Sequence, residues 1–289
     1  MLNIVKYIVL GLILSSGLLV YINSYWRHPF LAVINRWISW ILVSLLTGYF
    51  LIRFGISNRP FIVLSGTVFL LWFLVESILI WFNIRMLNFS AVSFFPKFSM
   101  NKGQIPWPNQ KRYIALKEFL RLNGFKEVQS IKTSILGIIS LYSPIYKDPT
   151  NKIFLQLLFI PQKNGIVNIY YVLISSTDEG SRYITDNLSL PFGGYVPGNW
   201  VKVRKPLCNS LKNLLKRHQK MLNESTENFI SWENTPLVEI NHQQSVLEYY
   251  NIKQGFLHPS NLHQTYGKLT AEGRYRLWKQ LLFLKYLGY

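Results

Sequence analysis

The chain has 289 residues, of which 49% are hydrophobic, 16% are aromatic and only 15% are charged. A disordered chain would be polar and poor in aromatic residues, and a disulfide-stabilised scaffold would need far more than one cysteine. Both classes are therefore excluded. Soluble domains carry about 25% charged residues, so the shortage of charge indicates a membrane protein.

The charge is strongly basic, with 31 Lys and Arg against 13 Asp and Glu and a formal net charge of +18. A basic chain attracts polyanions, and for a membrane protein the nearest polyanion is the anionic headgroup surface of the lipid bilayer. A compositional bias without any ligand is the alternative. No nucleic-acid-binding motif accompanies the charge, so nucleic acid is not the expected partner.

Three apolar runs dominate the first third of the chain, over residues 8–22, 34–52 and 61–82. A helix needs about 20 residues to cross a hydrocarbon core of about 30 Å. We therefore expect a transmembrane region over residues 1–84. Its helices are expected at about 4–25, 34–53 and 60–83. No small-residue cleavage site follows the first run, which favours an uncleaved helix over a signal peptide. The expected location is the cell (inner) membrane.

Aromatic and basic residues flank the apolar runs, where such side chains meet lipid headgroups. The expected interface residues are Trp26, Arg27, Arg36, Trp37, Trp81, Arg85 and Lys97. On one side of the membrane the flanks carry Arg27, Arg36, Arg85, Lys97 and Lys102, and on the other Lys6, Arg53 and Arg59. This excess of positive charge predicts a cytoplasmic C-terminal domain.

Glu76 is the single acidic residue in the first third of the chain and lies deep in the third apolar run. An ionised carboxylate there costs about 2.5–3.5 kcal/mol, so Glu76 should be protonated or paired. One interpretation is a structural hydrogen bond, with Ser39 or Ser44 as partner, or a contact with a partner subunit. The other is a proton, ion or substrate contact in transport. One acid among three helices makes a poor path, so we favour the structural pairing.

Residues 85–108 form the expected juxtamembrane linker, in which aromatic residues alternate with basic ones. Such a segment suits a peptide that lies along an anionic surface or one that packs on the following domain. Gly103, Pro106 and Pro108 mark its end. The remaining residues, 109–289, are enough for one extramembrane domain with its own core.

The pattern of this domain predicts an α+β fold. A helix should begin near Asn109 and end near Gly124. Runs of strand length follow at 125–132, 135–142, 153–160 and 166–175, with a bend at Gly137, a turn at 162–165 and a further short strand near 182–187. They predict an antiparallel β-meander packed by helices. Further helices are expected at 207–222, 243–253 and 270–287. The last of these is expected to pack on the sheet rather than on the membrane surface.

The third and fourth predicted strands are apolar on both faces, unlike a strand with one solvated face. Both faces of the sheet should therefore be covered, by the later helices, by a partner or by the membrane surface.

Chemical motifs are scarce. Residues 177–206 form a long irregular connection, which is typical of functional or mobile segments. Asp186 and His218 are the candidate catalytic residues, and an enzyme should have a deep pocket lined by Asp186, Tyr195 or His218. No nucleotide-binding, protease or esterase signature occurs. His258 and His263 lack a second pair of metal ligands, so we expect neither a metal nor a cofactor.

Without a catalytic motif, the leading hypothesis is a non-catalytic accessory, scaffold or sensor subunit with a protein partner in the membrane. The alternatives are a membrane-tethered enzyme with its site in the 177–206 connection and a small transport component that uses Glu76.

Overall fold

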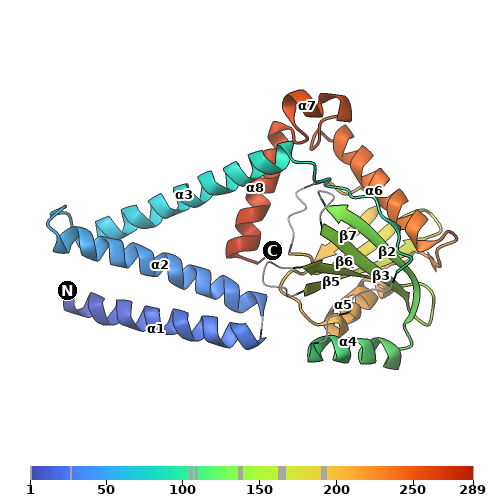
Figure 1. Ribbon diagram of the computed structural model, residues 1–289, viewed down its shortest axis with the longest axis horizontal. Helices are drawn as coiled ribbons and strands as arrows, with labels where there is room; N and C mark the ends of the chain where they lie inside the picture. Colours follow the sequence, from blue (N-terminus) through green and yellow to red (C-terminus); the bar gives the residue numbers. More distant parts are fainter. Residues whose placement is uncertain are drawn as a thin grey trace. The chain divides into compact units, whose positions relative to one another are not determined.

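Figure 1 shows the computed structural model, which describes residues 2–26, 28–103, 107, 110–135, 139–161, 167–189 and 194–288. The features predicted at Asn109, at Gly137 and in the turn over 162–165 lie outside these residues. The chain forms two compact units. The helical unit comprises residues Met1–Met86 and Arg274–Tyr289, and the sheet unit comprises residues Leu87–Gly273.

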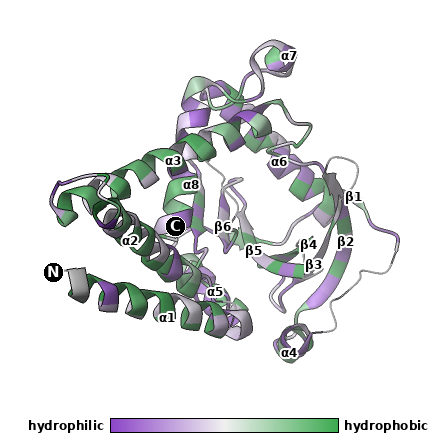
Figure 2. Cartoon of the chain, turned by 60° about the vertical axis from the view of Figure 1, so that its left-hand side comes forward, coloured by the Kyte–Doolittle hydropathy of each residue, from purple (hydrophilic) through white to green (hydrophobic). Residues whose placement is uncertain are grey.

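Three long helices make up most of the helical unit. They are α1 (Leu2–Trp26), α2 (Pro29–Arg53) and α3 (Phe61–Phe89), the last of which ends inside the sheet unit. All three are long and apolar enough to span a membrane, as predicted. Figure 2 shows apolar residues along their whole length, and Leu14, Ile62 and Leu70 are all more than half exposed. Apolar surface of this kind suits lipid, which suggests an integral membrane protein.

Helices α2 and α3 approach each other closely at Gly48, where a Cβ atom would overlap the Ser65 hydroxyl. Small residues at such a point allow two helix backbones to come together. Trp40 extends the contact, because its indole N–H donates to the Phe69 carbonyl at 3.0 Å and its ring stacks on the Phe69 ring.

Within the helical unit, two helix ends lie five or six residues from the predicted ones. Helix α2 begins at Pro29, earlier than expected, because proline suits the first turn and the His28 ring accepts the Phe30 N–H at 3.3 Å. Helix α3 continues to Phe89 because no glycine or proline interrupts the sequence after residue 83. The polar residues that follow the apolar run limit the part of α3 that could cross a membrane, but they do not end the helix.

Helix α8 (Ala271–Tyr286) belongs with the helical unit from Arg274 onward, so the prediction that it packs on the sheet was wrong. Its Trp278 ring stacks on Trp81, with 6.4 Å between centroids. Its Tyr286 ring contacts Trp40 at 4.9 Å and Trp37 at 5.5 Å. The apolar face of α8 therefore packs on the aromatic residues of α2 and α3.

The sheet unit contains the predicted antiparallel meander. Its strands are β1 (Ser99–Met100), β2 (Lys126–Ile135), β3 (Ile139–Lys147), β4 (Phe154–Pro161), β5 (Val167–Thr177), β6 (Arg182–Asp186), β7 (Trp200–Arg204) and β8 (Phe229–Ile230). Strands β1 to β7 lie in sequence order, and β8 pairs with the end of β5. All described pairs are antiparallel except β6–β7, which is parallel. The sequence did not predict β1, β7 or β8.

Helices cover both faces of the sheet. Helices α4 (Lys111–Leu122) and α5 (Leu211–Asn223) lie on one face, and α6 (Pro236–Lys253) lies on the other. The first core includes Leu116, Leu120, Leu155, Leu157, Leu173, Leu211 and Leu214. The second includes Phe98, Ile131, Ile145, Phe154 and Ile240. Strand β4 contributes alternate residues to the two cores, so the chain itself covers both of its apolar faces. The short helices η1 (Ser260–Leu262) and α7 (His263–Tyr266) connect α6 to α8.

The end of α3 and the segment that follows it pack against the rest of the sheet unit. The Asn241 side chain donates to the Phe98 carbonyl at 2.9 Å and accepts the Phe98 N–H at 2.8 Å. The Asn88 carbonyl accepts the Lys268 N–H at 3.2 Å. Of the two expectations for the linker, packing on the domain is therefore the one that this part of it meets.

Candidate functional site

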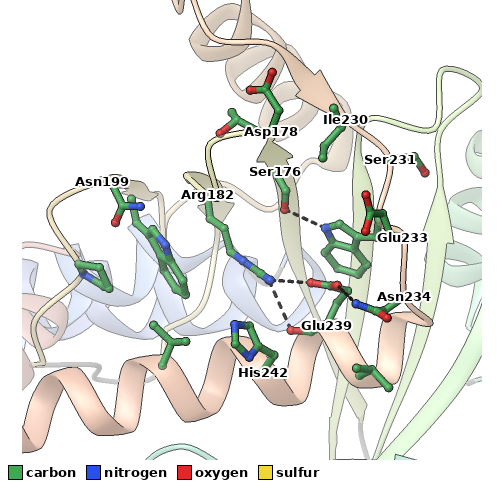
Figure 3. Close-up of a pocket in the computed structure, with 17 residues that line it drawn as sticks. Ser176, Asp178, Arg182, Asn199, Ile230, Ser231, Glu233, Asn234, Glu239 and His242 are labelled. Atoms are coloured by element: carbon green, nitrogen blue, oxygen red, sulfur yellow. Dashed lines mark hydrogen bonds and ion pairs between the residues drawn. The ribbon is translucent and has the colours of Figure 1, made fainter.

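The sheet unit contains a pocket of about 580 Å³ at the end of strand β5 (Figure 3). Its walls come from β5, from the turns that precede β6 and β7, from the segment around β8 and from α6. Its lining includes Ser176, Asp178, Arg182, Trp200, Ile230, Trp232, Glu233, Asn234, Val238, Glu239 and His242. A cavity of this size fits a small ligand.

Arg182 lies at the centre of the pocket wall and is only 7% exposed. Its guanidinium forms an ion pair with the Glu239 carboxylate at 2.7 Å and donates to the Gln243 side-chain oxygen at 3.0 Å. It also lies over the rings of Trp200 and Trp232, with 5.5 Å and 5.9 Å to their centroids. Burial lowers the pKa of Arg182, and the Glu239 carboxylate opposes this shift.

The wall around Arg182 is held by further hydrogen bonds. The Trp232 indole N–H donates to the Ser176 hydroxyl at 2.9 Å, and its ring stacks on Phe154 of the second core. The Asn234 amide donates to the second oxygen of Glu239 at 2.9 Å. Both carboxylate oxygens of Glu239 therefore help to fix the wall.

Two other carboxylates and a histidine line the pocket at its exposed edge. Asp178, Glu233 and His242 are all exposed, and they lie beside the apolar side chains of Ile230 and Val238. The Asp178 carboxylate accepts the Glu179 N–H, whereas Glu233 forms no hydrogen bond or ion pair with any described residue. The Arg182 charge is matched by Glu239, so the lining keeps two uncompensated negative charges.

The predicted catalytic residues do not line this pocket. Asp186 is 1% exposed and forms ion pairs with Arg204 at 3.2 Å and Lys202 at 3.8 Å. Burial lowers the pKa of Lys202 to about 8, and the Asp186 carboxylate opposes this shift. Asp186 therefore joins the parallel strands β6 and β7 through charge pairing. Tyr195 also lies outside the lining, and its backbone N–H donates to the Asn251 side chain at 2.7 Å.

His218 is completely buried beneath the first face of the sheet. Its two ring nitrogens form hydrogen bonds with the Thr185 hydroxyl at 2.9 Å and the Ser175 hydroxyl at 3.1 Å. Burial lowers its pKa to about 4, so the imidazole is neutral at pH 7. These contacts indicate a structural histidine that ties α5 to β5 and β6.

The low pKa of His218 makes the stability of the sheet unit depend on pH. Below an unfolded pKa of about 6.5, the unfolded chain takes up a proton that the native chain does not, so stability falls as pH falls toward 4. Between pH 7 and pH 5 we expect the free energy of unfolding to fall by about 2 kcal/mol from this residue. Urea titrations in mild detergent measure it, and His218→Gln should remove this component. An equal pH dependence in the variant would contradict the assignment.

Glu76 lies on the inner side of the helical unit, where it is 8% exposed, and forms an ion pair with Lys285 of α8. It also interacts with the Tyr286 side chain. The expected partners were wrong: the Ser39 and Ser44 hydroxyls donate to backbone carbonyls of their own helix. A cation from the C-terminal helix therefore compensates the carboxylate.

Two of the predicted interface residues hold the end of α8. The Arg36 guanidinium donates to the Lys285 carbonyl at 2.8 Å, and the Trp37 indole donates to the Tyr286 carbonyl at 2.7 Å. The last carbonyls of a helix lack partners within the helix, so they accept hydrogen bonds from the Trp37 indole and from the Arg36 guanidinium, whose positive charge also suits this end of the helix.

The other predicted interface residues are placed differently. Trp26, at the end of α1, and Arg85, near the end of α3, are exposed, and Trp81 stacks on Trp278. Lys97 contacts Ser245 of α6 and lies 4.0 Å from the Glu248 carboxylate. Arg27 lies outside the described residues. Headgroup contact for these residues stays a prediction.

Sequence reasoning missed the residues that build the pocket. Arg182, Trp200 and Trp232 come from three separate segments that meet only in the folded chain, so no spacing pattern in the sequence links them. The available signal was the irregular 177–206 connection, because seven of its residues line the pocket. Among the described residues, no group of three or more His, Cys, Asp or Glu side chains is arranged to hold a metal ion.

Comparison with known proteins gives no match: no protein-family model fits the chain, and no curated protein or solved structure is significantly similar to it.

Proposed function

We propose that the protein is a multi-pass, membrane-anchored sensor subunit without catalytic activity, whose sheet unit binds a small organic cation. The observation that carries the proposal is the pocket, in which two uncompensated carboxylate charges lie beside tryptophan and aliphatic side chains. In a chain with a net charge of +18, such a pocket is a local negative site that concentrates cations.

The chemistry of the wall supports a cationic ligand. Trp200 and Trp232 already hold the Arg182 guanidinium near their ring faces, so the aromatic wall tolerates positive charge. Ile230 and Val238 offer apolar surface to the carbon skeleton of a ligand, and Glu233 offers its free carboxylate. A ligand with an ammonium group and an apolar body fits both features.

The three apolar helices serve as the anchor in this proposal, with the sheet unit on the cytoplasmic side of the cell membrane. A protein partner in the same membrane would receive the signal. The net charge favours a membrane with anionic headgroups.

Native mass spectrometry of the full-length protein, purified from its own membrane in mild detergent, tests both parts of the proposal. It reports bound small molecules and stoichiometric subunits in one measurement. We expect a bound organic cation and a partner subunit in the wild type. Glu233→Lys should lose the small molecule, because the substitution places a positive charge at the exposed edge of the pocket.

Glu224→Lys is the matched control, since it makes the same charge change at an exposed site outside the pocket. This variant should keep the bound molecule. A wild-type chain that carries neither a ligand nor a partner would contradict the proposal.

A membrane-tethered enzyme is the second candidate, favoured by the share of the pocket that residues 177–206 contribute. Its base would be His242, which lines the pocket, rather than His218, which is buried and hydrogen-bonded elsewhere. In that case His242→Ala would keep the bound compound but stop its conversion during incubation. A compound that the wild type leaves unchanged would exclude this reading.

A transport role for Glu76 has weaker support, because Lys285 already pairs with the carboxylate. It requires that Glu76→Gln abolish flux through the reconstituted protein, and unchanged flux would remove it.

A further inference from the structure

The helices on the two faces of the sheet differ in charge. Helix α4 carries four basic residues and one acid, and α5 carries four basic residues and no acid. The 25 residues of these two helices therefore have a net charge of +7. On the opposite face, α6 carries two acids and one lysine, a net charge of −1. The two faces of the sheet differ sharply in charge.

The eight cations form what we call the α4–α5 surface. They are Lys111, Arg112, Lys117, Arg121, Lys212, Lys216, Arg217 and Lys220. Both helices pack their leucines into the same core, so their outer sides both face away from the sheet. The whole α4–α5 surface therefore lies on one side of the sheet.

Most of this charge is not compensated within the chain. Arg121 pairs with Glu118 and Lys220 pairs with Glu224, but all four side chains are more than half exposed. Lys111, Lys212, Lys216 and Arg217 are exposed and form no ion pair with a described residue. Exposed pairs contribute little stability, so folding does not account for this concentration of cations.

Apolar side chains are exposed among the cations. Ile114 is 63% exposed and Leu122 is 73% exposed, although both belong to a helix whose other face fills the core. They lie eight residues apart, on the same side of α4. Cations that surround exposed Ile and Leu are typical of helices that rest at the boundary of headgroups and acyl chains.

We infer that the α4–α5 surface docks on the anionic headgroup surface of the membrane, with Ile114 and Leu122 entering the acyl boundary. Charge complementarity favours the membrane as the binding partner of this surface, because a leaflet that contains anionic lipid attracts juxtamembrane basic residues. The three apolar helices supply the membrane in the same molecule. Docking here leaves the pocket, which is lined by α6 on the other face, open to the aqueous phase.

The test places a fluorophore on the surface of the full-length chain. Cys208→Ser removes the native thiol, and Asn213→Cys adds a labelling site among the α5 cations. The labelled protein is placed in nanodiscs of phosphatidylcholine alone or of phosphatidylcholine with phosphatidylserine. Quenching by acrylamide, which carries no charge, reports exposure to water. We expect the label to be protected in the phosphatidylserine discs and exposed in the others.

A label at Tyr249→Cys, on the exposed side of α6, is the matched control and should be quenched equally in both kinds of disc. Each basic residue near an anionic surface contributes about fivefold to binding, so replacing Lys212, Lys216, Arg217 and Lys220 by glutamine should lower the equilibrium constant for docking more than about a hundredfold. High salt should release the unsubstituted surface in the same way, without any substitution.

Equal quenching at position 213 in both kinds of disc would overturn the inference. Protection at position 249 instead of 213 would overturn it as well. If position 213 were protected only after an oligonucleotide was added to neutral discs, the surface would be a nucleic-acid site and not a membrane site.

Discussion

Replacing Glu239 by alanine is expected to lower the free energy of unfolding of the sheet unit by about 3–5 kcal/mol. The substitution leaves the Arg182 guanidinium buried between two tryptophan rings without its counterion. A buried charge that loses its partner keeps the full cost of its desolvation, and this exceeds the net strength of the original pair. Urea titration of the full-length protein in mild detergent measures the change.

The double variant Arg182→Met with Glu239→Leu distinguishes the loss of the ion pair from the cost of leaving a buried charge without a partner. It removes both charges and should be more stable than Glu239→Ala alone, because no uncompensated ion remains. Glu118→Ala provides the control, since it breaks an exposed pair with Arg121 and should cost about 0–1 kcal/mol. A cost below about 1 kcal/mol for Glu239→Ala would show that the pair is not buried as described.

The same series tests the pocket. Glu239→Ala should also abolish ligand binding, because the carboxylate holds both Arg182 and Asn234 in the wall. Glu233→Lys should abolish binding without a loss of stability, because the exposed Glu233 carboxylate forms no hydrogen bond or ion pair with a described residue. The two variants therefore separate the wall that shapes the pocket from the edge that meets the ligand.

Removing the charge of Glu76 is expected to release the C-terminal helix from the helical unit. Glu76→Gln leaves the Lys285 ammonium without a carboxylate, and because the Lys285 side chain is 34% exposed the cost should lie below the value of about 3–5 kcal/mol for a fully buried pair. Limited digestion with trypsin, which cleaves after Arg276 and Lys279 of α8, measures how often the helix is released. We expect faster cleavage in Glu76→Gln and in Lys285→Gln than in the wild type.

A charge swap gives the sharper result. Glu76→Lys combined with Lys285→Glu restores an opposite pair and should return cleavage of α8 toward the wild-type rate, although each single substitution increases it. Lys111→Gln, in the sheet unit, removes one positive charge elsewhere and should leave cleavage unchanged. If the swapped protein is cleaved as fast as the single variants, the pair does not hold the helix.

Local patterns predicted much of the fold. The three long apolar helices, α4, and strands β2 to β6 were all expected, β3 a few residues earlier than observed, because apolar runs of helix or strand length and the helical spacing of apolar residues in α4 mark these segments. The strands that were missed, β1, β7 and β8, have only two to five residues. Such short strands have too few residues to show a hydrophobic period. They form only where a neighbouring strand can hydrogen-bond to their backbone.

The sites were predicted less well. Asp186 and His218 were predicted as the candidate catalytic residues, but the structure uses Asp186 in an ion pair and His218 in hydrogen bonds beneath the sheet. Sequence position could not reveal this, because the partners Arg204, Thr185 and Ser175 lie on other elements.

The sequence by itself determined the class of the molecule: three apolar helices long enough to cross a membrane and an α+β domain with a basic net charge. Composition and hydrophobic period depend on each segment alone, so they can be read without knowing what each segment touches. Only the tertiary structure decided that Lys285 compensates Glu76, that Arg182 lies over the rings of Trp200 and Trp232, and that the basic helices α4 and α5 lie on the same face of the sheet. Charge pairing and pocket formation depend on contacts between residues far apart in the chain, and local sequence does not specify those contacts.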